Sequence, residues 1–292
     1  MTAEVAQLQR HAEEEASRFP ALLARAEHLA GTVLLGEHGR RRSGQGDDFW
    51  QYRPMRPGDS VRQIDWRRSA RSDDQFVRER EWQIAQSVLV WVDPGASMRF
   101  ASDAGLETKA ARARLTALAA AILLIRGGER VGLTGWHLPP RRGNAQIERL
   151  AQMLSVEDTD DYAIPEARGM LPHARAIFIS DFMSDLAPIE AAMTKAADRG
   201  VRGAMLQVLD PSEEAFPFQG RTIFESVAGS VAHETLKASD LRDRYTSRLN
   251  ARRDHLRQLC RVTGWHFHCH HTNDSAQSAL LWLYRALDGS HG

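Results

Sequence analysis

The stretch SVLVWVDPGASMRF, residues 87–100, decides the fold. Its first six residues form a continuous apolar run, which is typical of a parallel strand covered on both faces. The run ends in Asp93, and the loop that follows begins with Pro94 and Gly95. We therefore expect a central strand at 87–92 with an acid at its carboxyl end.

Strand and helix patterns alternate along the rest of the chain. Residues 11–33 form a helical pattern, and the Gly- and Arg-rich residues 34–47 indicate a loop. Further helices are expected at 107–126, 143–154, 187–199, from a cap at Ser239, and at 275–287; further strands are expected at 131–136, 176–180, 203–209 and 265–269. Such alternation predicts a doubly wound, mostly parallel α/β sheet.

Composition permits a globular protein with a large core. The chain has 292 residues, 42% of them hydrophobic, and its 38 basic side chains balance 38 acidic ones. Zero net charge removes the global attraction to nucleic acid. The longest apolar run, 115–125, is shorter than the ~20 residues that span a bilayer and reads as a buried helix. Two cysteines and no signal sequence indicate a cytoplasmic protein.

A second informative stretch is YRPMRPGDSVRQIDWRRSARSDDQFVRERE, residues 52–81. Turn residues stand at its centre, and Arg62 and Asp65 share a face in a helical turn. The acids between the arginines favour internal ion pairs over phosphate binding. We expect Trp66 to be buried and to anchor this segment to the α/β domain, so that Trp66→Ala costs roughly 3 to 5 kcal/mol.

This segment resembles the hallmark of the bacterial family catalogued as domain of unknown function 58. The matching residues are Pro57, Gly58, Asp59, Arg62, Ile64, Asp65, Trp66, Ala70 and Arg71. The resemblance continues in DPGASMRF (93–100), ISDF (179–182), VLDPSEEAFPFQG (208–220) and LRDRYTSRLNARRDHL (241–256). It implies a von Willebrand factor A-like (Rossmann-like) domain at 87–289, after an N-terminal helical segment at 1–38 and an Arg-rich signature segment at 39–86.

The resemblance also implies a candidate metal site at the carboxyl edge of the sheet. The von Willebrand A fold holds Mg²⁺ there with Asp-x-Ser-x-Ser and further oxygen ligands. Here Asp93, Ser97 and Asp181 could hold the ion through waters, but Gly95 stands in place of the first serine. We expect weak Mg²⁺ binding that Gly95→Ser improves. The alternative is that both acids bind backbone N–H groups and stabilise their loops.

A histidine cluster, WHFHCHH at 265–271, is a second candidate. Alternation in a strand places His266, His268 and His270 on one face, where imidazoles can share a transition metal. A polar face on an edge strand explains the cluster equally well, because zinc sites draw ligands from more than one segment. Local motifs of hydrolases, phosphate-binding loops and zinc proteases are absent from the sequence.

The resemblance implies a non-enzymatic adaptor or co-chaperone that works with a MoxR-type AAA+ ATPase. The alternative is a metal-dependent hydrolase with a dispersed site at the strand edge. If the edge binds the partner, Asp93→Ala and Asp181→Ala should weaken association and leave the fold intact, because we expect their side chains to face solvent. Charge reversal of Arg62 or Arg71 should instead lower stability.

Overall fold

The computed structural model describes most of the chain, and its residues fall into two compact units. The larger unit comprises 1–37 and 86–292, and the smaller one comprises 38–85. Each unit is considered by itself. The described residues are 20–33, 49–55, 64–71, 74–80, 86–136, 139–156, 160–167, 169–229 and 232–288.

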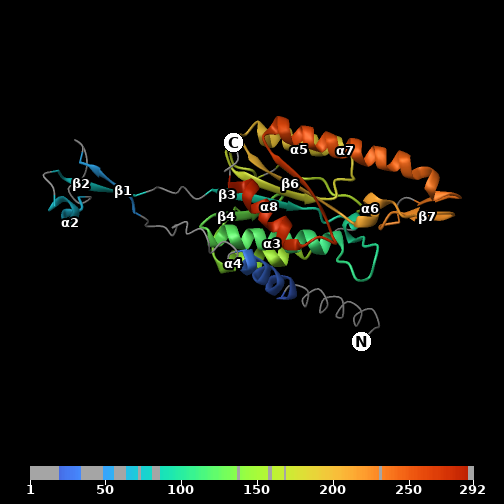
Figure 1. Cartoon of the computed structure of the whole chain (residues 1–292), viewed down its shortest axis with the longest axis horizontal. Coiled ribbons are helices and arrows are strands. Elements are labelled where there is room, and N and C mark those ends of the chain that lie inside the picture. Colours follow the sequence, from blue (N-terminus) through green and yellow to red (C-terminus); the bar gives the residue numbers. More distant parts are fainter. Residues whose placement is uncertain are drawn as a thin grey trace. The chain divides into compact units, whose positions relative to one another are not determined.

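A five-stranded parallel sheet forms the centre of the larger unit (Figure 1). Its strands are β3 (Ser87–Val92), β4 (Arg130–Leu133), β5 (Arg175–Ser180), β6 (Arg202–Leu209) and β9 (His266–His271). They lie in the order β4-β3-β5-β6-β9. The predicted α/β class with a mostly parallel sheet is confirmed.

Helices cover both faces of this sheet. They are α3 (Lys109–Arg126), α4 (Asn144–Leu154), α5 (Leu186–Ala197), α7 (Arg242–Thr263) and α8 (Ala276–Asp288). Val90 and Ile177 pack with α3, α4, α8 and the helix at 20–33. Their neighbours Trp91 and Phe178 point to the opposite face and pack with α5 and α7. Strand residues alternate between two cores, which explains the continuous apolar runs.

Helix α3 lies in the middle of the first core. Thr108 caps its N-terminus by accepting a hydrogen bond from the Ala111 amide at 3.1 Å. Residues 115–125 are all buried, so the expectation of a buried helix there is confirmed. In the part of the chain that the structure describes, no helix combines the length and apolar character needed to cross a membrane.

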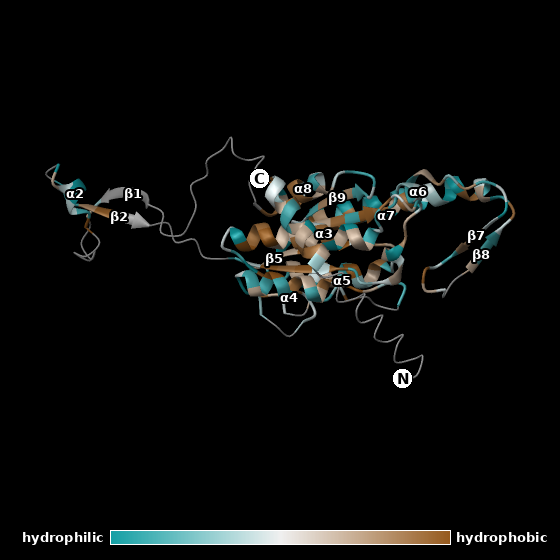
Figure 2. Ribbon diagram, turned by 90° about the horizontal axis from the view of Figure 1, so that it is seen from below, coloured by the Kyte–Doolittle hydropathy of each residue, from teal (hydrophilic) through white to brown (hydrophobic). Residues whose placement is uncertain are grey.

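The polar stretch at 211–238 contains three elements that the sequence pattern did not predict. They are the short helix α6 (Pro211–Ala215) and the antiparallel hairpin of β7 (Thr222–Glu225) and β8 (Ala232–Thr235). Figure 2 shows the hairpin at the α6 end of the unit. Helix α7 begins only at Arg242, after a 3₁₀ turn at Ala238–Leu241, so the predicted cap at Ser239 is wrong.

The smaller unit is an antiparallel pair of β1 (Phe49–Pro54) and β2 (Phe76–Arg80) with one short helix, α2 (Trp66–Ser69). Asp65 caps α2 by accepting from the Arg68 amide at 3.0 Å. The buried side chains beside it are Ile64 and Val77. Within this unit Trp66 is 59% exposed, so its ring is not buried among the unit's own described residues, and its anchoring to the α/β domain stays a prediction. Ile64 and Val77 pair with each other in an antiparallel bridge.

Candidate functional site

Three acids stand at the carboxyl ends of neighbouring strands. Asp93 follows β3, Asp181 follows β5 and Asp210 follows β6. The strand order reverses between β3 and β5, because β4 lies on one side of β3 and the later strands lie on the other. Open α/β sheets bind their ligands at such a switch point. Asp93 and Asp181 were predicted from the sequence, and Asp210 was not.

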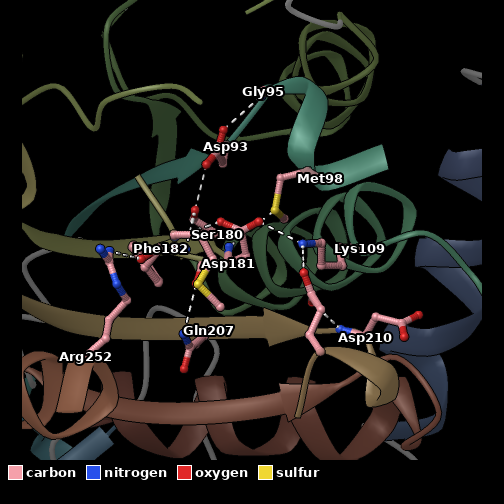
Figure 3. Close-up of polar contacts among 12 residues, drawn as sticks. Asp93, Gly95, Met98, Lys109, Ser180, Asp181, Phe182, Gln207, Asp210 and Arg252 are labelled. Carbon is pink, nitrogen blue, oxygen red and sulfur yellow. Dashed lines mark hydrogen bonds and ion pairs between the residues drawn. The ribbon is translucent and has the colours of Figure 1, made fainter. Parts of the chain in front are cut away.

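The centre of this edge is a buried ammonium group. Lys109, the first residue of α3, is 1% exposed. Its Nζ lies 2.8 Å from Oδ2 of Asp181 and 2.6 Å from Oε1 of Glu213 (Figure 3). We call Lys109, Asp181 and Glu213 the buried triad. A positive charge therefore lies between Asp181 at the strand edge and Glu213 on the following short helix, as a metal ion would.

Short helix α6 positions the third member of the triad. Asp210 and Glu213 form a capping box: the Asp210 carboxylate accepts from the Ser212 amide, and Glu213 Oε2 accepts from the Asp210 amide at 2.8 Å. Pro211 supplies the fixed φ of a first helical residue. The other carboxylate oxygen of Glu213 is thus held toward Lys109.

The triad contains two carboxylates and one ammonium. Burial lowers the pKa of Lys109, but the charges of Asp181 and Glu213 outweigh it and raise that pKa above its ordinary value. Burial raises the pKa of Glu213, and the nearby Asp181 adds to the effect against the opposing influence of Lys109. Lys109 is therefore charged near neutral pH, and the triad carries a net negative charge when both acids are ionised.

Asp93 is bonded within the protein. Its Oδ2 accepts from the Ser180 hydroxyl at 2.6 Å, and its Oδ1 accepts from the Gly95 amide at 2.8 Å (Figure 3). Burial raises its pKa to about 6. Asp93 and Asp181 are each 1% exposed, so the expectation that these side chains face solvent is wrong. Asp181 likewise accepts from the Met183 amide at 2.9 Å, as a loop-stabilising acid does.

The residues present do not fit a Mg²⁺ site. One oxygen of Asp181 is taken by Lys109, and both oxygens of Asp93 accept hydrogen bonds from the protein. Ser97 is the remaining predicted ligand, and its buried hydroxyl has no hydrogen-bond partner in the part of the chain that the structure describes. Within the described ranges, no group of three or more His, Cys, Asp or Glu side chains could hold a metal. The ammonium of Lys109 takes the place of the cation.

Gly95 is a steric requirement of the loop. A Cβ at this position would lie 2.7 Å from the carbonyl oxygen of Asp161 and 2.9 Å from Oδ1 of Asp93. Backbone on one side and a bonded carboxylate on the other leave no room for a side chain. The expectation that Gly95→Ser would restore a metal ligand is therefore contradicted by the packing.

A cavity of about 840 Å³ lies above the triad. Its floor includes Lys109, Asp181 and Glu213, together with Ser97 and Ser212. Its walls come from α6, α7 and the β7–β8 hairpin. Of the predicted metal ligands, Ser97 and Asp181 line this cavity, whereas Asp93 lines a neighbouring one of about 630 Å³.

Comparison with known proteins places the chain in a family. Residues 51–255 match the family described as "Protein of unknown function DUF58". The chain belongs to this family. Uncharacterized proteins of Mycobacterium tuberculosis and Mycobacterium bovis are each 27% identical to this DUF58 chain over an alignment of 252 residues, and the match covers 80% of this chain and 77% of theirs.

Two solved structures are similar at 15% sequence identity. One is an aerotolerance-related membrane protein from Bacteroides fragilis, with a TM-score of 0.45, and the match covers 70% of this DUF58 chain and 99% of the other. The second is the conserved hypothetical protein BatB from Bacteroides thetaiotaomicron, with a TM-score of 0.44, where the match covers 70% and 100%. The α/β assignment above rests on the strand pairing of this chain itself.

The family's signature residues belong to the smaller unit. Gly58, Asp59 and Arg62 lie outside the described residues. Asp65 caps α2, and Trp66, Ala70 and Arg71 are exposed.

The histidine cluster lies on β9, and among the described residues it forms no metal site. His270 is buried and lies 2.9 Å from a guanidinium nitrogen of Arg112. His268 stacks on Trp282 with ring centroids 5.0 Å apart, and His266 is exposed. Burial lowers the pKa of His270 to about 4, so its imidazole is neutral near neutral pH.

Sequence reasoning missed Lys109 and Glu213. One signal was present: Lys109 is one of only three lysines in a chain with 38 basic residues, and it begins an apolar helix. A lysine in a chain whose other basic residues are nearly all arginines indicates a need for a compact positive charge at this position. Glu213 could have been found from the Asp-Pro-Ser-Glu capping box at 210–213.

Proposed function

We propose that this chain is a non-enzymatic adaptor or co-chaperone that binds other proteins through the carboxyl edge of its sheet. The carrying observation is the buried triad beneath a large cavity: Lys109 supplies the cation from within the chain. The edge therefore offers a partner protein a cavity, and the positive charge of Lys109 stands there in place of a metal ion. The family resemblance supports a MoxR-type AAA+ ATPase as that partner.

Exposed apolar side chains beside the cavity support protein binding. Ile223 on β7 is 57% exposed, Val227 is 44% exposed and Leu236 is 77% exposed. They lie on or next to the β7–β8 hairpin, which projects from the α6 end of the unit (Figure 2). Exposed apolar side chains gathered beside a polar-rimmed cavity are typical of interaction sites.

The hydrolase alternative finds no support in the geometry of the edge. Activation of water needs a metal with an open position or a general base within hydrogen-bond reach of it. The carboxylates of Asp93 and Asp181 instead accept from groups of the protein itself. Among the described residues the Ser97 hydroxyl has no hydrogen-bond partner, so none of them is placed as a base to activate it.

The free cysteines support a cytoplasmic location. Cys260 and Cys269 form no disulfide in the described structure, and burial raises their pKa values to about 12 and about 11. Thiols kept reduced are typical of a reducing compartment.

Affinity capture from the host's own lysate tests the proposal. The whole chain, tagged and immobilised, should retain the MoxR-type ATPase, and charge reversal of Arg248 at the cavity rim should reduce that capture. Arg261→Glu, the same charge change on α7 away from the cavity, is the matched control. Mg²⁺-dependent turnover of generic ester or phosphate substrates without ATPase capture would favour the hydrolase.

A further inference from the structure

Four aromatic rings form one wall of the cavity above the buried triad. Phe216 ends α6, Phe218 follows it, Phe224 lies on β7 and Tyr245 lies on α7. The centroid of the Phe216 ring lies 5.2 Å from that of Phe218, 5.7 Å from that of Phe224 and 4.9 Å from that of Tyr245. Rings at these distances form a fixed apolar surface.

Two arginines line the same cavity from α7. Arg244 and Arg248 are one helical turn apart, so they share the face of the helix that carries Tyr245. Both are exposed, and neither has an ion-pair partner among the residues that the structure describes. The next arginine on this face, Arg252, donates to the carbonyl oxygens of Phe182 and Ser184 (Figure 3 shows the first bond). Arg244 and Arg248 are therefore available to an external acid.

The floor of the cavity has a different character from its rim. The buried triad brings two carboxylates against one ammonium, so an acid placed at the floor would meet Asp181 and Glu213. Ser212 also lines the cavity and is only 8% exposed, and its side chain lies beside the Asp210 carboxylate. The floor is therefore polar and acidic, in contrast to the aromatic wall and the arginines.

These three features select one class of ligand. The volume of about 840 Å³ exceeds that of a single side chain and falls in the range of sites that enclose a ligand. The aromatic wall favours an apolar side chain, and the rim favours carboxylates through bidentate arginine contacts. A basic ligand would face Arg244 and Arg248. Asp161 and Glu225 also line the cavity, so a ligand carboxylate has to lie on the two arginines, and an extended polyanion would meet these acids.

We propose that the cavity binds a short acidic and apolar peptide segment of a partner protein. The segment inserts an aromatic or large aliphatic side chain against Phe216 and Phe224 and places a neighbouring Asp or Glu on Arg244 and Arg248. The inference rests on the proposed function, since it assumes that the edge recognises a protein, but it does not depend on which protein that is.

Selection from a displayed library of random linear peptides on the immobilised whole chain tests this inference. Enriched peptides should pair an aromatic or large aliphatic residue with Asp or Glu. Arg248→Glu should weaken a synthetic winner roughly 10-fold or more, as loss of a central anchor does. Arg248→Gln should weaken it less. Arg261→Glu should bind as the unchanged protein does, and circular dichroism confirms that each variant is folded.

Several results would overturn the inference. They are enrichment of Lys- or Arg-rich peptides, enrichment of no sequence over the starting library, or full binding of the acidic winners to Arg248→Glu. The outcome is separable from that of the lysate capture. Acidic and apolar winners without ATPase capture would retain the cavity chemistry and reject the ATPase partnership, whereas ATPase capture that Arg248→Glu leaves intact would reject the cavity as its site.

Discussion

Replacement of Lys109 by methionine removes the charge of the buried triad while keeping a side chain of similar length. Asp181 and Glu213 would then remain beside each other without their ammonium, at positions where Nζ lay 2.8 and 2.6 Å away. The side chains of Lys109 and Asp181 are 2% and 1% exposed, so little water can compensate. Removal of one partner from a buried ion pair costs about 3 to 5 kcal/mol.

Urea unfolding at neutral pH measures this loss directly. Since whole domains are stable by about 5 to 15 kcal/mol, Lys109→Met should remove a large part of the free energy of unfolding. The melting temperature should fall by about 10 °C, at roughly 2 to 4 °C per kcal/mol for a unit of this size. Lys195→Met, an exposed lysine on α5, should change stability by less than about 0.5 kcal/mol.

A triple variant separates charge from packing. In Lys109→Met with Asp181→Asn and Glu213→Gln, no buried charge is left alone, so much of the lost stability should return. The reasoning is refuted if Lys109→Met unfolds within about 1 kcal/mol of the unchanged protein, or if the triple variant is no more stable than the single one.

Three further predictions concern the strand edge and the signature segment. The pKa of Asp93 is raised to about 6, so its protonation stabilises the fold as pH falls. Relative to Asp93→Asn, the free energy of unfolding of the unchanged protein should rise by about 2 kcal/mol between about pH 7 and about pH 4.5 in urea titrations. A difference between the two proteins that does not change with pH would contradict the raised pKa. Gly95→Ser should lower the free energy of unfolding by roughly 1 to 3 kcal/mol and give no Mg²⁺-dependent rise in melting temperature. The control Gly31→Ser should be tolerated, because a Cβ there meets nothing within 4 Å. Equal melting curves for the two variants would refute the steric argument. Trp66→Ala should cost less than about 1 kcal/mol because the ring is 59% exposed within its unit, and a loss of 3 kcal/mol or more would show that the ring anchors the signature segment.

The sheet was predictable because its strands are covered on both faces. Continuous apolar runs such as 87–92 and 176–180 occur where both sides of a strand meet helices, and both became strands within one residue of the expected ends. Helix α3 was predictable for a similar reason, since its apolar residues extend all round its circumference.

The β7–β8 hairpin was not predictable from periodicity. β7 alternates half-buried and exposed residues over only four positions, and three of the four residues of β8 are exposed. A pattern this short and polar is typical of a loop, so only the pairing of the two segments in the structure identifies them as strands of a hairpin. The small unit escaped prediction in the same way, because β1 and β2 are separated by α2 and a long intervening stretch.

Two acids of the site, Asp93 and Asp181, were predictable, whereas their environment was not. Asp93 and Asp181 follow apolar strands, and parallel strands bring their carboxyl ends to one edge. Their burial depends on α3 and α6, which place Lys109 and Glu213 over the same edge from residues 72 and 32 positions away from Asp181. Such long-range pairing leaves no local pattern in the sequence, so a family's metal site was expected where an ammonium lies.

The most direct test of the adaptor proposal is calorimetric titration of the whole chain with the host's purified MoxR-type ATPase. The unchanged protein and Arg261→Glu should give the same saturable binding, and Arg248→Glu should bind at least about 10-fold more weakly, a difference of about 1.4 kcal/mol. Absence of binding to the unchanged protein would contradict the ATPase partnership, and equal binding by Arg248→Glu would contradict the use of the carboxyl-edge cavity.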